Sequence, residues 1–249
     1  MLWTEYRDHY PKVEQQPPLV PIREQFDVAT PRFAFTMHSF PMPRVWFLSE
    51  DGHRLVQVQH DLFILNWRKL DETPEDYPHY REIRQRFVDA IGLFEEFIER
   101  ESIGPLKAVQ AELTYVNHID AREADGTRKP LSRIIRAWAD EREVGQSPKS
   151  GTFVASGLPE FEETSIATHY VMRNEDGKPV GRLHISVEPQ RYTKDNTPLY
   201  AMSLVARGAP RSPDLGAAVA VLDEGHKAIV NGFTSITTKE MHSVWERTQ

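Results

Sequence analysis

The chain has 249 residues, of which 39% are hydrophobic and 27% are charged, and its formal net charge at pH 7 is −7. This length suits one large domain or two closely packed halves, and the composition is that of a folded globular chain. Because the sequence contains no cysteine, disulfide frameworks, thiolate zinc sites, iron–sulfur clusters and cysteine nucleophiles are excluded, which fits a reducing compartment.

The net charge and the hydropathy of the chain limit which classes of partner and which cellular compartment we expect. The acidic balance argues against general binding to nucleic-acid phosphates, because that mode relies on clustered Lys and Arg. No window approaches the roughly 20 apolar residues that span a bilayer. The first residues, from Met1 to Tyr6, carry an acid and lack the apolar stretch of a secretory signal. We therefore expect a cytoplasmic protein that binds neither nucleic acid nor membrane.

The first part of the chain predicts an antiparallel meander. An extended segment is expected at residues 17–28, where the sequence is rich in proline at its start. Two strand-like runs, 45–48 and 55–60, flank Asp51-Gly52, a dipeptide typical of hairpin turns. A third run with alternating apolar side chains follows at 62–68.

A long amphipathic helix is predicted next, at residues 80–101, between Pro78 and Gly104-Pro105. Its apolar residues recur every three or four positions, at Ile83, Phe87, Ile91, Phe94 and Ile98. Residues 107–118 then alternate apolar and polar side chains, which predicts a half-buried strand with one polar face.

Residues 121–149 are the least regular part of the chain and are expected to connect two halves, with a short helix at 131–142. A second meander is then expected from three strand-like runs, around a turn at Asp176-Gly177; the runs are 161–173, 180–188 and 199–207.

Two helices are predicted to close the chain. The first carries an apolar stripe from Leu215 to Phe233 that includes His226. The second is predicted to begin at Thr237, because Glu240 follows three residues later and completes a capping box.

The predicted fold class is α+β, in which antiparallel meanders from two halves form a curved sheet, or two joined sheets, packed on long helices. The halves, about 1–120 and 150–249, would together form a single compact domain spanning 1–249. Parallel topology is disfavoured because the strands come in hairpin-linked groups. The repeated order of meander and helix also suggests an internal duplication.

Several stretches of the sequence together resemble one protein family. They are Asn66-Trp67-Arg68, residues 112–117, Leu222-Asp223-Glu224-Gly225-His226 with the following residues to Phe233, and residues 237–245. This combination is similar to a sporadically distributed, uncharacterised prokaryotic family of about this length. The similarity covers most of the chain and departs from the family at Pro21 and Ile22, where a Glu is typical. The resemblance implies no assigned reaction, cofactor or catalytic residue.

His226 is the first candidate for a functional role. It lies four residues after Leu222 and three before Ile229, so its ring is expected to point inward. One interpretation is a buried neutral imidazole that a hydrogen bond satisfies. The other is a ligand-binding or acid–base group, for which Glu112 or Glu188 would be the carboxylate partner.

A second candidate group combines polar residues of three predicted strands, namely Glu112, Tyr115, Asn117, His118, His184, Glu188 and Arg207. By strand parity, Glu112 and His118 share one face, and so do His184 and Glu188, so each pair could line a cleft. His118 and Asp120 are potential metal ligands, but their spacing matches no defined motif, and we predict neither a metal nor a cofactor.

Trp67 and Arg68 form a third candidate, together with the aromatic and basic residues between 69 and 81. Trp, Tyr and Arg are enriched at binding hot spots, so these side chains could anchor a protein partner. Packing at the edge of the core is the alternative interpretation.

Sequence motifs of known catalytic classes are missing. The sequence has no Gly-x-Ser-x-Gly, no Gly-rich phosphate loop and no His-Glu-x-x-His. We therefore expect a non-enzymatic interaction or small-ligand-binding protein that forms a homodimer or binds a protein or small-molecule partner. The alternative is a hydrolase or transferase whose site uses His226 or His118 with Glu112.

Overall fold

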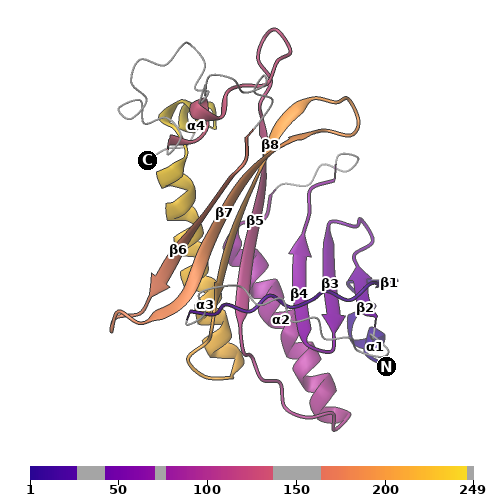
Figure 1. Ribbon diagram of the computed structural model, residues 1–249. Helices are drawn as coiled ribbons and strands as arrows, with labels where there is room; N and C mark the ends of the chain where they lie inside the picture. The colour runs from indigo at the N-terminus through magenta and orange to yellow at the C-terminus, as the bar shows by residue number, and fades with distance from the viewer. Residues whose placement is uncertain (27–42, 71–76, 137–163, 246–249) are drawn as a thin grey trace. The chain divides into compact units, whose positions relative to one another are not determined.

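The computed structural model describes residues 1–26, 43–70, 77–136 and 164–245, which fall into two compact units. Unit 1 comprises Met1–Ala108 and Ser212–Leu215, and unit 2 comprises Val109–Arg211 and Gly216–Gln249. Each unit contains a four-stranded antiparallel sheet (Figure 1). The predicted α+β class is confirmed. Within the described residues, no helix has the length and apolar character needed to cross a membrane.

The sheet of unit 1 is a simple meander in the order β1-β2-β3-β4. The elements of this unit are α1 (Trp3–Tyr6), β1 (Lys12–Gln16), β2 (Arg44–Leu48), β3 (Arg54–Gln59), β4 (Leu62–Trp67) and α2 (Tyr80–Arg100). The predicted Asp51-Gly52 turn joins β2 to β3, and Gly52 has a φ of 76°, which side chains disfavour. The first strand was predicted wrongly, because β1 precedes residue 17 and the described part of 17–28 contains no strand.

Aromatic side chains hold the helices of unit 1 to its sheet. Phe63 of β4 contacts Phe87 and Phe94 of α2, with ring centroids 6.0 and 5.6 Å apart. Tyr6 of α1 is buried, and its hydroxyl donates a 2.7 Å hydrogen bond to the carbonyl oxygen of Ala90 in α2. The amphipathic face predicted for α2 therefore does pack against the core.

The sheet of unit 2 has the order β5-β8-β7-β6, so β6, β7 and β8 form a meander and β5 joins at the edge beside β8. The elements are β5 (Ala111–Asp120), η1 (Leu131–Arg133), β6 (Ile166–Arg173), β7 (Pro179–Arg191), β8 (Pro198–Gly208), α3 (Leu215–Ile236) and α4 (Lys239–Val244). The strand predicted to end the first half is thus part of the second sheet, and the boundary lies at Ala108 rather than near residue 120. Of the predicted helix at 131–142, the described part is the single 3₁₀ turn η1, and the part after residue 136 lies outside the described residues.

The two units share a three-stranded meander followed by a long helix. These are β2-β3-β4 with α2 and β6-β7-β8 with α3. The fourth strand differs, because β1 pairs with the first strand of its meander and β5 pairs with the last. Any internal correspondence is therefore restricted to the meander and its helix.

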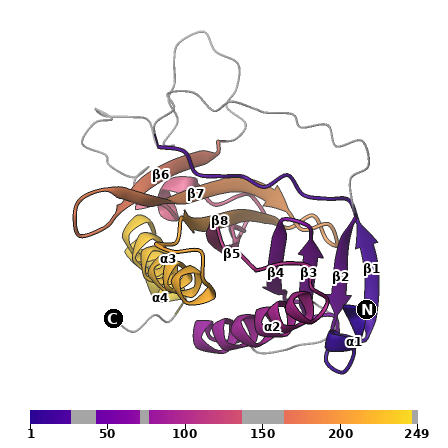
Figure 2. The ribbon, with the colours of Figure 1, turned by 90° about the horizontal axis from the view of Figure 1, so that it is seen from below.

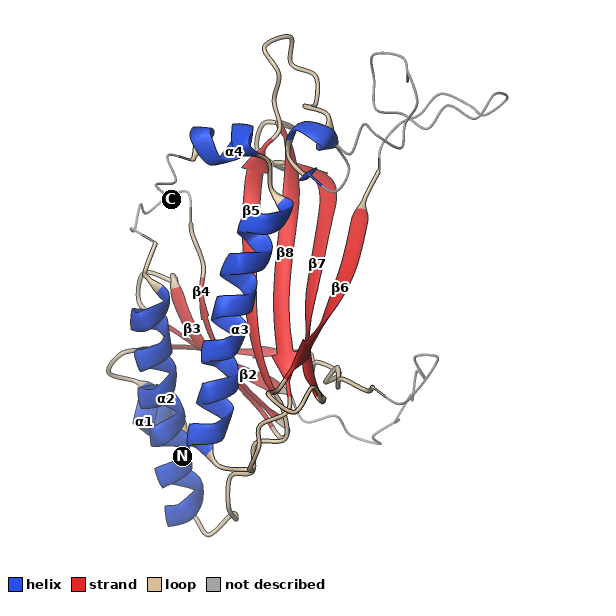
Figure 3. Cartoon of the chain, turned by 90° about the vertical axis from the view of Figure 1, so that its left-hand side faces the viewer, coloured by secondary structure: helices blue, strands red, loops and turns tan. Residues whose placement is uncertain are grey.

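Helix α3 lies along one face of the second sheet, which we call the helix-side face (Figures 2 and 3). Glycine allows the close approach, since a Cβ added to Gly225 would lie 3.0 Å from the Cβ of Ala206 in β8. Leu183, Ile185, Val187, Met202, Leu204 and Ile229 are buried between the helix and the sheet. Along β5, the odd-numbered residues from Leu113 to Ile119 belong to this half-buried side, and the even-numbered residues lie on the exposed outer face.

Helix α4 begins one residue later than predicted. The side chain of Thr238, and not that of Thr237, accepts the hydrogen bond from the backbone N–H of Met241 and caps the helix. Thr237 is fully buried, and its hydroxyl donates a 2.6 Å hydrogen bond to the carbonyl oxygen of Phe233. Its side chain therefore closes the end of α3.

Candidate functional site

His226 points toward β5, as the helical stripe predicted, and its partner there is a tyrosine. The Nδ1 atom of His226 lies 3.0 Å from the hydroxyl of Tyr115. Burial lowers the pKa of His226 below its ordinary value, and the nearby Asp223 carboxylate opposes this shift. The hydrogen bond then joins the tyrosine hydroxyl to a neutral imidazole. This arrangement matches the structural interpretation of His226 as a satisfied polar group.

The carboxylates expected beside His226 lie on the other side of the sheet. Glu112 and Glu188 belong to the outer face, whereas Tyr115 and His226 meet at the helix-side face. Glu112 instead accepts a charge-assisted hydrogen bond from Arg207 Nε, at 2.5 Å. The two residues are directly opposite in the pairing of β5 with β8. Because the Arg207 side chain is only 9% exposed, this pair is a structural contact on β8 rather than part of a His/Glu dyad.

The remaining outer-face candidates do not converge. His118 and Glu188 lie in one row of the sheet but are separated by Ala201 of β8, which places them two strand spacings, about 10 Å, apart. His118 contacts the ring of Tyr192 instead, with centroids 5.9 Å apart. Among the described residues, no three His, Asp or Glu side chains gather as metal ligands would.

The third candidate group supports the packing interpretation. Arg68 donates from Nε to the carbonyl oxygen of Gly52 at 2.9 Å, and so closes the β2–β3 turn. Trp67 stacks on the buried ring of His53 and contacts Tyr77 edge-on, at 6.4 and 5.2 Å between centroids. Both candidate side chains thus contribute to the structure of unit 1.

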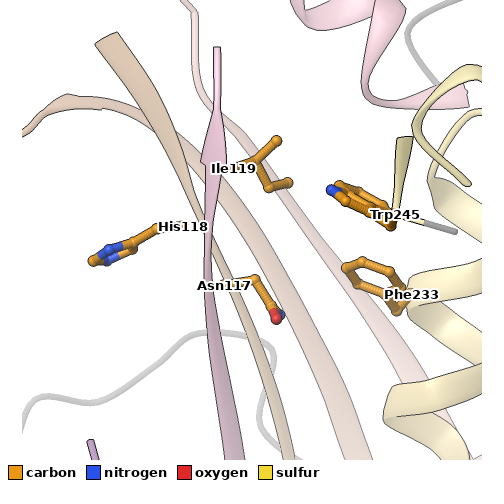
Figure 4. A pocket seen from close by; sticks show the side chains of 5 residues that line it. All are labelled: Asn117, His118, Ile119, Phe233 and Trp245. Atoms are coloured by element: carbon orange, nitrogen blue, oxygen red, sulfur yellow. The ribbon is translucent and has the colours of Figure 1, made fainter. Parts of the chain in front are cut away.

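A small pocket opens on the helix-side face beside the end of β5. Its volume is about 210 Å³, and it is lined by Asn117, His118, Ile119, Phe233 and Trp245. Figure 4 shows the side chains of Asn117, Ile119, Phe233 and Trp245 on one side of β5, whereas His118 points away to the outer face. Phe233 of α3 and Trp245, which follows α4, pack against each other with ring centroids 5.1 Å apart. We call the space that these four inward side chains line the β5 pocket.

Two of the side chains that line the β5 pocket carry a polar group, the amide of Asn117 and the indole N–H of Trp245. The half-buried Asn117 side chain has no hydrogen-bond partner within the described part of the chain. In Figure 4 its amide is directed into the space in front of Phe233, and the indole nitrogen of Trp245 lies on the ring edge nearest β5. None of the four side chains is charged. A neutral molecule with an apolar body and one polar end matches this chemistry.

Sequence reasoning selected Asn117 and did not place Phe233 and Trp245 with it. Phe233 was assigned to the apolar stripe of a helix, which is correct, whereas Trp245 directly follows α4. The contact of both rings with β5 depends on the packing of α3 and α4. The available signal was parity, since Asn117 shares a strand face with Tyr115 and Ile119.

Comparisons of this chain with protein-family models, with curated proteins and with solved structures gave no match.

Proposed function

We propose that the protein binds a small neutral molecule, with an aromatic body and an amide-like polar end, in the β5 pocket. The observation that carries this proposal is the Asn117 amide, which lacks a partner among the described residues and is directed into apolar walls. A ligand that shields this half-buried amide from water must pair with it, because a polar group buried without a partner costs free energy.

The size of the pocket limits the ligand. At about 210 Å³ it is smaller than the roughly 300 Å³ from which drug-sized sites begin. It is larger than an engineered cavity of about 150 Å³ that accepts benzene. One aromatic ring with a short polar substituent, or two fused rings, therefore fits the available volume.

The polar groups favour a neutral ligand. The Asn117 side chain offers both a donor and an acceptor, so a primary carboxamide can form two hydrogen bonds with it. A charged ligand would lose its hydration without meeting an opposite charge, because the four inward side chains are uncharged. Stacking against Phe233 and Trp245 would add the contacts that aromatic pairs prefer.

Calorimetry with three probes of similar shape tests the proposal: benzamide, benzoate and benzylamine. We expect benzamide to bind most tightly and the Asn117→Leu variant to bind it about five- to tenfold more weakly, as the loss of roughly 1 kcal/mol of hydrogen bonding predicts. The matched control is Asn231→Leu, the same substitution at an exposed position of α3. Equal binding of all three probes, or unchanged binding by Asn117→Leu, would contradict the proposal.

The alternative of a hydrolase or transferase with a His/Glu site has weaker support. His226 pairs with Tyr115, and Glu112 pairs with Arg207 on the opposite face.

We further propose that the protein belongs to the uncharacterised prokaryotic family that it resembles and forms a homodimer. A cytoplasmic location is also proposed, which the lack of cysteine supports.

A further inference from the structure

Two histidines face each other on the outer face of the second sheet, away from the β5 pocket. His169 of β6 and His184 of β7 are directly opposite in the strand pairing. Their Nδ1 atoms lie 2.8 Å apart, and their rings cross at 71° with centroids 4.8 Å apart. His169 is exposed and His184 is half-buried, so solvent reaches the pair.

The distance between the two nitrogens matches a particular coordination geometry. Imidazole nitrogens lie about 2.0–2.1 Å from a bound transition metal. Two such ligands at a right angle are therefore about 2.9 Å apart, whereas tetrahedral ligands are about 3.3 Å apart. The observed 2.8 Å is the length of a hydrogen bond between the two rings, and it is close to the right-angle separation, which is typical of Cu(II) and Ni(II) bound to nitrogen ligands. The rings must turn out of the hydrogen bond for both lone pairs to point at one ion.

We propose that His169 and His184 form a two-nitrogen site for a divalent copper or nickel ion. In the metal-free pair one Nδ1 carries the proton that the other accepts. On binding, that proton moves to Nε2 of the same ring, and both Nδ1 lone pairs coordinate the ion. No proton is released by this change from the neutral pair. Water completes the coordination, because no third ligand of the His, Cys, Asp or Glu type joins the pair among the described residues.

The neighbours of the pair restrict the strength of the site. Val205 of β8 lies in the same row as the pair, and Arg182 lies two residues before His184 on the same face of β7. The guanidinium charge opposes a second cation, so the site is expected to be labile. A bound ion would nevertheless link the edge strand β6 to β7 and raise the stability of the sheet by mass action.

The test uses the full chain and CuSO₄ alone as the probe, added in steps up to one equivalent. Electron paramagnetic resonance of the wild type should show hyperfine coupling to two nitrogens. His169→Gln and His184→Gln should each bind at least tenfold more weakly and lose one equivalent of copper. The matched control is His79→Gln, because His79 is exposed at the start of α2 and its side chain makes no capping bond.

Equal copper stoichiometry in the wild type and in both variants would overturn the proposal, as would coupling to a single nitrogen in the wild type. Circular dichroism of each variant checks that the sheet has formed. The spectrum of the wild type does not depend on any variant, so the proposal stays testable even if a substitution disturbs β6.

Discussion

The hydrogen bond between Tyr115 and His226 links the sheet of unit 2 to its longest helix. The hydroxyl donates to Nδ1 only while that nitrogen is unprotonated. Burial favours the neutral imidazole, because it lowers the pKa of His226 below its ordinary value. Protonation would therefore oppose the burial, and Nδ1–H would then donate to the hydroxyl oxygen instead.

This coupling predicts a pH dependence of stability. The unfolded chain takes up the His226 proton at an ordinary pKa of about 6.5, whereas the folded chain does so at a lower pH. The contribution of His226 is therefore complete above about pH 6.5 and is lost as the pH falls through the folded-state pKa. Urea unfolding at a series of pH values should show this loss in the wild type and not in His226→Gln. The same slope in both proteins would contradict the assignment.

Two sequence periods, that of the helix containing His226 and that of strand β5, determine how much of the Tyr115–His226 contact was predictable. The helical stripe predicted that His226 points inward, and it does. The prediction that Glu112 is the partner of His226 was wrong. Glu112 and Tyr115 lie on opposite faces of β5, so a residue of α3 cannot contact both. Parity was visible in the sequence, whereas the position of α3 along β5 depends on tertiary packing.

At the level of elements, two facing glycines let β7 and β8 approach under α3. Gly181 and Gly208 are directly opposite in the strand pairing. A Cβ added to Gly181 would lie 2.6 Å from the carbonyl oxygen of Arg207. Because that atom belongs to the backbone of β8, a side-chain rotation cannot relieve the overlap, and the strands must separate.

We predict that Gly181→Ala lowers the free energy of unfolding by about 1–3 kcal/mol, the usual cost of overpacking. The matched control is Gly92→Ala in α2, where an added Cβ meets nothing within 4 Å. That substitution should raise stability by up to about 1 kcal/mol, because alanine favours the helix over glycine. Chemical denaturation measures both. An unchanged midpoint for Gly181→Ala would show that β7 and β8 can separate without cost.

Most strands and helices were predictable because their apolar residues recur at the regular spacing of a strand or of a helix. The hairpins at Asp51-Gly52 and Asp176-Gly177 and the long helices α2 and α3 were predicted near their observed bounds. Strand β1 was missed because its residues are mostly polar and exposed at the sheet edge, so neither face of the strand carries an apolar pattern.

For the whole molecule, the order of strands was the part that local patterns could not provide. β5 pairs with β8, which lies about 90 positions later in the chain. It therefore belongs to unit 2, although the residues that precede it in sequence belong to unit 1. Such a pairing depends on long-range contacts rather than on turns. The pairing also matters for the proposed function, because it brings Asn117 beneath α3.

The second sheet also bears on self-association, because its edge strand β6 exposes apolar side chains. Tyr170 and Val171 are 47% and 44% exposed, and apolar side chains on an edge strand favour pairing with another chain. We predict a homodimer, the commonest closed assembly of soluble proteins. Light scattering should give twice the mass of the chain at micromolar concentration. A monomer mass there and at higher concentration would contradict the prediction.

A ¹H–¹⁵N NMR titration with benzamide tests the proposal that the β5 pocket binds a small neutral aromatic molecule. We expect the signals of the Asn117 side-chain amide and of the Trp245 indole N–H to shift together and saturate. The indole signals of Trp3 and Trp46 in unit 1 should remain in place. Shifts confined to unit 1, or no saturable shift of the Asn117 and Trp245 signals, would contradict it.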